Sequence, residues 1–352
     1  MKSKLKISIP CLCILMCIII AVSFTEISQS VKKSIELSIS IVLPALFPFF
    51  VISELFLSFI SINENNLFCK IYKKIFNMPI STIPVFIIGL VSGYPVGAAL
   101  TYKLYTDGLI TKSQAERLVC FVNNSGPLFI ICSVGCGMLK NIKVGVMLYI
   151  LHIFISICTG IILGIGKKSN GGQILLTKNK FNLALSIEKS FMQCIKIIGF
   201  VVFFGIINDI ILMCFEKYLS GFITNKYLDF IYSILFSILE ITNGISYATK
   251  NISIEYALIM SAFAISWSGL SVYLQTVSVT KNTISLKKYL ITKALSAFTA
   301  GLICYIILKL TNDDISIKKA NINLVYISSL IGMYILYFIY YLSKKKKKIT
   351  II

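Results

Sequence analysis

Long apolar runs recur along this chain, and their length constrains the fold more than any other feature. Many of them are about 20 residues long, the length that an α-helix needs to cross the hydrocarbon core of a bilayer. The chain is 57% hydrophobic and only 14% charged, whereas soluble domains carry about 25% charged residues. The sequence therefore predicts an all-α, polytopic membrane protein with about eight to ten membrane segments.

The apolar runs define the expected segments. They lie at 7–24, 36–60, 83–105, 118–139, 143–166, 190–214, 228–248, 254–279, 289–310 and 322–342. The run at 7–24 is predicted to be a retained first span, because it has no clear small-residue cleavage site. Residues 61–80 are predicted to form a polar loop, and Pro44 and Pro48 are expected to kink the segment before it.

The net charge of +20 comes almost entirely from Lys in loops and in the tail from Lys344 to Lys348. Lys beside a membrane span sets its orientation and contacts anionic lipid. A nucleic-acid partner would require a basic face on a folded soluble domain, and the pattern indicates no such domain. The lipid bilayer is therefore an expected partner, and nucleic acid is not.

Two polar, glycine-rich clusters interrupt the apolar sequence of the first half. They are Gly89 to Gly97 and Asn123 to Pro127. Gly and Pro break the helical hydrogen-bond ladder, and broken backbone is tolerated at membrane depth only where protein buries it or where it lines a cavity. Broken helices in corresponding positions of two halves are typical of a transporter's binding site.

A similar order of features returns in the second half. Gly93 lies 57 residues after Glu36, and Gly244 lies 56 residues after Glu188. A second glycine break follows in each half, 33 and 25 residues later. This order and spacing predict an internal repeat of two units, a common plan of transporters. Whether the units are inverted depends on how many segments cross the membrane, and an inverted arrangement is expected.

The predicted domains follow from this repeat and from a polar stretch in the middle of the chain. They are an N-terminal transmembrane helix at 1–30, a first gate-like repeat at 31–166, a polar linker at 167–185, a second gate-like repeat at 186–310, and a C-terminal transmembrane helix with a basic tail at 311–352.

Four motifs together resemble the sporulation integral membrane protein YlbJ family. They are Ser92 to Ala98, Asn123 to Phe129, Glu240 to Gly244 and Ser268 to Gln275. The chain departs from the family at Ala99, where a Lys is expected. The resemblance implies the nucleoside-recognition gate domain that nucleoside transporters also carry. It further implies a role in spore formation, in the mother cell at the outer forespore membrane, moving dipicolinate toward the spore.

The polar residues of the four motifs are the candidate substrate-binding residues. They are Ser92, Gly93, Tyr94, Asn123, Asn124, Ser125, Gly126, Glu240, Thr242, Asn243, Gly244, Ser268, Gly269 and Gln275. Dipicolinate is a flat dianion, which the free N–H groups at a broken helix's N-terminus can bind without a full cation. The alternative is that these small and polar residues join helices to one another.

Several single residues remain open between two roles. Glu240 either accepts a coupling proton or bonds freed backbone N–H groups. Trp267 is a possible wall of the site, and Lys196 and Arg117 are possible anion ligands, although each also suits a position at the membrane interface. His152 is either functional or packed.

Three functions are compatible with this pattern: a dipicolinate carrier, a carrier of nucleosides or other metabolites, and a membrane scaffold that transports nothing. An enzyme ranks last, because no nucleophile, base and orienting group recur at a plausible spacing and no catalytic residue is predicted. Cys132 and Cys136 are one helical turn apart but have no partnering cluster, so no metal and no other cofactor is expected. The pattern identifies no protein partner.

Overall fold

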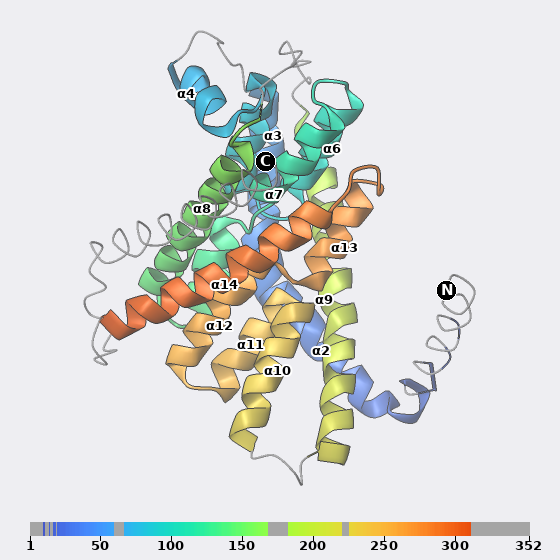
Figure 1. Cartoon of the computed structure of the whole chain (residues 1–352). Coiled ribbons are helices and arrows are strands. Elements are labelled where there is room, and N and C mark those ends of the chain that lie inside the picture. The colour runs from blue at the N-terminus through green and yellow to red at the C-terminus, as the bar shows by residue number, and fades with distance from the viewer. Residues whose placement is uncertain are drawn as a thin grey trace.

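The computed structural model describes residues 20–59, 67–167, 182–219 and 225–310, with four isolated positions before them. Within these ranges the chain is helical and contains no strand (Figure 1), which confirms the predicted all-α class. The predicted segment at 322–342 and the lysine tail lie outside the described residues, as do most of the segment at 7–24 and most of the linker.

The first half is a series of helices, most of them shorter than a membrane span. They are α2 (Phe24–Leu37), the π-helix η1 (Ser38–Val42), α3 (Leu43–Phe59), α4 (Leu67–Phe76), the 3₁₀-helix η2 (Ile80–Thr82), α5 (Ile83–Val91), α6 (Val96–Thr106), α7 (Lys112–Val122), the π-helix η3 (Leu128–Met138) and α8 (Ile142–Gly164). Polar breaks therefore divide both glycine-rich segments of this half.

The second half contains the same kinds of element. They are α9 (Leu183–Leu219), α10 (Asn225–Leu239), α11 (Ile241–Asn251), α12 (Ile254–Trp267), α13 (Gly269–Val279) and α14 (Lys287–Leu310). The order α10, break, α11, α12, break, α13, α14 parallels α5, break, α6, α7, break, η3, α8. The internal repeat and its inversion stay predictions, as do the domain boundaries.

Four described helical stretches are long and apolar enough to cross a membrane. They are Ile142–Gly164, Leu183–Met213, Ile254–Val279 and Lys287–Leu310. A fifth is added if Leu67–Phe76 and Ile80–Val91, which are bent by 96° relative to each other, count as one span. The structure thus agrees with a polytopic membrane protein, and the total of eight to ten segments stays a prediction.

The outer surfaces of α9 and α14 are apolar. Phe191 and Phe203 on α9 are exposed, and so are Ile291, Leu295 and Phe298 on α14. Apolar surface of this extent is costly in water and suits lipid tails.

Residues 67–76 correct the prediction of a polar loop at 61–80. They form α4, in which Cys69, Tyr72 and Phe76 are buried while Lys73 and Lys74 are exposed. The buried residues recur at helical spacing, so the lysines occupy only the outer face of an amphipathic helix. Thr111 caps the start of α7: its hydroxyl accepts a hydrogen bond from the Gln114 N–H, and its own N–H donates to the Gln114 side chain.

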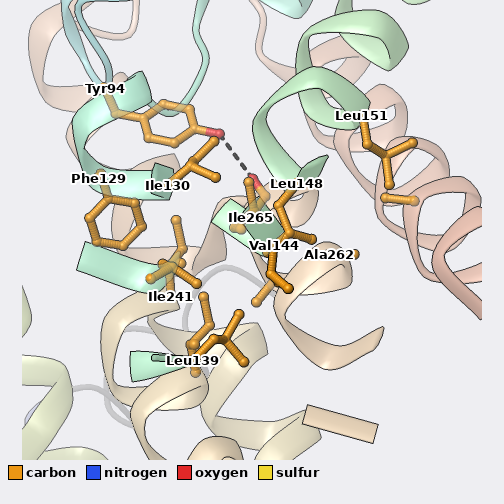
Figure 2. Close-up of a cluster of buried hydrophobic side chains, with 14 of the residues drawn as sticks. Tyr94, Phe129, Ile130, Leu139, Val144, Leu148, Leu151, Ile241, Ala262 and Ile265 are labelled. Atoms are coloured by element: carbon orange, nitrogen blue, oxygen red, sulfur yellow. Dashed lines mark hydrogen bonds between the residues drawn. The ribbon is translucent and has the colours of Figure 1, made fainter. Parts of the chain in front are cut away.

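The largest hydrophobic cluster joins elements of both halves around Tyr94 (Figure 2). It includes Phe129 and Ile130 of η3, Ile241 of α11 and Ile265 of α12. Helix α9 packs along α2 and α3, and α14 packs across α12, α8 and α7 (Figure 1). This packing brings the four polar breaks to the middle of the described structure.

Candidate functional site

The four polar breaks lie against one another in two pairs. A Cβ placed on Gly93 would lie 3.1 Å from the backbone N of Gly126, and a Cβ on Gly269 would lie 3.2 Å from the carbonyl oxygen of Leu239, beside Glu240. Gly93 and Gly269 also have φ angles of +80° and +75°, which side-chain-bearing residues rarely adopt. Glycine is therefore required at both positions for conformation and for close approach.

Glu240 begins helix α11. Its Oε2 accepts a hydrogen bond of 2.7 Å from the Asn243 N–H, and the side chain is buried. The structure thus shows Glu240 bonding a freed backbone group, the second of its two predicted roles. Because a carboxylate already occupies this helix N-terminus, an anionic substrate does not fit there.

A small central cavity of about 50 Å³ lies between the breaks. Seven of the predicted residues line it: Gly93, Tyr94, Ser125, Gly126, Glu240, Thr242 and Gln275. The structure therefore brings together residues from all four motifs. Typical ligand pockets have roughly 300 Å³ or more, so the cavity holds a few waters but no organic solute in this conformation.

The side chains of the second break, Asn123 to Pro127, take part in a buried polar network. The Asn123 amide donates to the Thr276 hydroxyl at 2.9 Å and to the Tyr289 hydroxyl at 3.1 Å. The Asn124 Oδ1 accepts from the Ser156 hydroxyl at 3.1 Å and from the Lys293 ammonium at 3.3 Å. Four side chains from α8, α13 and α14 thus contact the two Asn side chains of this break. We call these six residues the polar network: Asn123, Asn124, Ser156, Thr276, Tyr289 and Lys293.

Lys293, Tyr289, Thr276 and Ser156 are residues that sequence reasoning missed. Lys293 lies six residues into α14 and is only 4% exposed. Its signal in the sequence was an ionisable residue inside an apolar segment, the same signal that singled out Glu240. Lys was interpreted there as a residue of loops and interfaces, so this one was passed over.

His152 belongs to this region as well. Its Nε2 accepts a hydrogen bond of 3.2 Å from the Ser125 N–H, and its Nδ1 lies 3.5 Å from the Ser266 hydroxyl. The ring therefore links the second break to α12, rather than only filling space.

Other candidates lie outside the central cavity. Ser92 donates to the Ile88 carbonyl at 2.7 Å, and Gly244 packs against the backbone of Ser237. Ser268 contacts the Tyr289 hydroxyl at 3.3 Å, so it borders the polar network.

The three remaining single candidates do not line the central cavity. The Arg117 guanidinium donates to the carbonyl of Asn77, which holds the turn after α4. The Trp267 indole donates to the Ile238 carbonyl at 3.0 Å. Lys196 is exposed and lines a separate cleft.

Two larger cavities flank the central one. The polar cleft has about 520 Å³ and includes Lys33, Asn243 and the buried Asn208, whose amide atoms have no hydrogen-bond partner among the described residues. The charged cleft has about 320 Å³ and includes Glu54 and Lys196. Neither cleft shares a lining residue with the central cavity.

Comparison with known proteins adds one relationship. The chain is 33% identical over 138 residues to the sporulation integral membrane protein YlbJ of Bacillus subtilis (strain 168). The match covers 38% of this chain and 33% of the length of YlbJ. No protein-family model matches the chain, and no solved structure does.

Proposed function

We propose that the chain is a membrane transporter of a small organic anion in spore formation, with dipicolinate as its substrate, at the outer forespore membrane. Its relative's name, sporulation integral membrane protein YlbJ, supports the sporulation and membrane parts of this proposal. The observation that carries transport is the succession of three cavities along α9 and its neighbours.

The cavities follow one another along α9. Residues 188–196 line the charged cleft, Ile197 and Val201 line the central cavity, and residues 205–212 line the polar cleft. An α-helix rises 1.5 Å per residue, so this stretch is about 36 Å long. That length is close to the roughly 30 Å thickness of a bilayer's hydrocarbon core.

The helices between residues 33 and 54 line the same three cavities, but in the opposite order along the chain. Residues 33–40 line the polar cleft, Val42 and Leu46 line the central cavity, and Phe50 and Glu54 line the charged cleft. Two antiparallel helical stretches thus border one route. This supports a path across the membrane that is closed at its centre.

The substrate class has two supports. The family resemblance implies dipicolinate, and the polar network contains a buried Lys293. The broken backbone beside it supplies further polar groups without more full charges. A dianionic aromatic acid suits a cation, amides and tyrosine rings better than an apolar solute does.

Uptake into liposomes tests the proposal. The full chain is reconstituted, and the uptake of labelled dipicolinate and of labelled uridine is compared with that of protein-free liposomes. We expect dipicolinate uptake that saturates with concentration and is absent without protein. Uptake of uridine alone would favour the nucleoside carrier, and flux of neither solute would favour the scaffold; both outcomes contradict dipicolinate transport.

A further inference from the structure

A buried cation on α14 has no carboxylate beside it. The ion pairs among the described residues are Lys189 with Glu54 and Lys288 with Glu116. Lys293 is in neither, although it is more deeply buried than any of these residues. Removing a charge from water is costly unless a partner compensates for it, so ionisable residues inside membrane spans are rare and mostly functional.

The surroundings of the Lys293 ammonium compensate for its charge only in part. The ammonium donates one hydrogen bond, of 3.3 Å, to the Asn124 Oδ1. It lies 5.4 Å from the ring centroid of Tyr94 and 5.7 Å from that of Tyr289. An ammonium has three N–H donors, and an aromatic face attracts a cation without replacing an anion. The Lys293 amine therefore has donors left for a carboxylate, and a carboxylate bound there would in turn favour the charged form of the amine.

Tyr94 separates this ammonium from the central cavity. The Tyr94 side chain lines the cavity, and its ring also faces Lys293. The ring is held at its tip by a hydrogen bond of 3.3 Å from the hydroxyl to the Ile265 carbonyl (Figure 2). The hydroxyl also interacts with the Ser268 side chain and the Ser125 backbone. A change of rotamer at Tyr94 would break these contacts and join the cavity to the polar network, so the closed position of the ring is the one that the contacts favour.

We propose that Lys293, together with Asn124, binds a carboxylate group of the transported molecule, and that the Tyr94 ring covers this subsite in the closed structure. The proposal rests on the proposed function and assigns its anion-binding residue. Glu240 also lines the central cavity. In its ionised form it would repel a second carboxylate, which makes the position covered by Tyr94 the more favourable one for an anion. The ligand class is a small planar carboxylic acid.

Binding to the purified full chain in detergent tests the subsite without any flux. The probes are labelled dipicolinate, the monocarboxylate picolinate and uncharged uridine. Lys293→Met removes the charge at similar length, and Lys293→Arg keeps it. Lys288→Met, five residues earlier on α14, is the matched control because its ammonium lies at the surface beside Glu116.

We expect Lys293→Met to weaken dipicolinate binding at least tenfold, Lys293→Arg to retain most of it, and Lys288→Met to leave it unchanged. Asn124→Asp provides a second variant, since it places a carboxylate against Lys293 and should exclude the external one. Replacing a buried charge by an apolar side chain is often neutral or stabilising, so Lys293→Met is expected to unfold at the wild-type temperature or above it.

Three results would overturn the subsite. The Lys293→Met protein could bind dipicolinate as the wild type does, or the wild type could bind neither dipicolinate nor picolinate. The third is a large loss of thermal stability in Lys293→Met while its folded fraction still binds dipicolinate. Failure of transport is distinguishable from these. Lys293-dependent binding without uptake into liposomes contradicts the transporter and keeps the subsite. Uridine uptake by a protein that binds neither acid contradicts the subsite and keeps a transporter.

Discussion

At the scale of single residues, two buried ionisable side chains face the same small region from different elements. The Glu240 carboxylate accepts a hydrogen bond from a backbone N–H of α11, whereas the Lys293 ammonium contacts one amide oxygen and two aromatic rings. A side chain that completes a helix N-terminus has a structural task, and its loss should therefore be felt in stability. A cation with spare donors is available to a ligand.

Glu240 gives a prediction about stability. Glu240→Ala removes the acceptor for the Asn243 N–H, and loss of such a cap costs about 1 kcal/mol. Glu240→Gln keeps a carbonyl oxygen at the same place and should cost less. The measurement is the thermal unfolding of both variants in the same detergent. Equal melting temperatures for Glu240→Ala and the wild type would mean that the cap does not stabilise α11.

At the scale of elements, the polar breaks divide what would be long membrane spans into short helices, and the ends of these helices meet inside the protein. The breaks are buried against each other, so their backbone groups are enclosed by protein rather than by lipid. Gly93 and Gly126 allow the first two breaks to touch, and Gly269 allows the other two. The site is thus built by backbone approach as much as by side chains.

Gly93→Ala tests this approach, with Gly108→Ala as its control. Both glycines have positive φ, of +80° and +71°, but a Cβ on Gly108 would meet nothing within 4 Å. Each substitution should carry the strain of the left-handed conformation, about 1–2 kcal/mol. Only Gly93→Ala should also push Gly126 away and reduce dipicolinate flux at least tenfold. Equal flux from the two variants in liposomes would remove the paired breaks from the transport mechanism.

At the scale of the whole molecule, α9 connects the three cavities and presents its other face to the outside. Val201 lines the central cavity and is 2% exposed, whereas Phe203, two residues further, is 53% exposed. One helix therefore separates the proposed path from the surrounding lipid. The two flanking clefts carry exposed charges, as Lys33 and Lys196 show.

Blocking the centre of the path tests it. Val201→Trp fills the central cavity and should abolish uptake, while Phe203→Trp on the lipid-facing side should leave uptake within about twofold, because membrane-facing positions accept Trp. Both proteins are checked for insertion and for a single size-exclusion peak before uptake is measured. Normal uptake by a well-folded Val201→Trp protein would show that solute does not pass this point.

Residue order alone determined the helical membrane class and the positions of the breaks, because span length and the backbone effects of Gly and Pro are local properties. It also showed the motifs that resemble the YlbJ family. Gly93 and Gly126 were found from those backbone effects, Glu240 as an ionisable residue in an apolar segment, and Gln275 as a polar residue of a motif. Tertiary structure brought all four to one cavity.

Only the tertiary structure decided that Lys293 is buried. Its neighbours in the sequence, Lys287 and Lys288, are exposed at the start of the same helix, so composition cannot distinguish the three. Burial depends on Asn124 and Tyr94, which come from two other segments, and on Tyr289 one turn earlier on α14 itself. Contacts between segments that are distant in the chain leave no periodic trace in it, and packing therefore determined which charge lies at the centre.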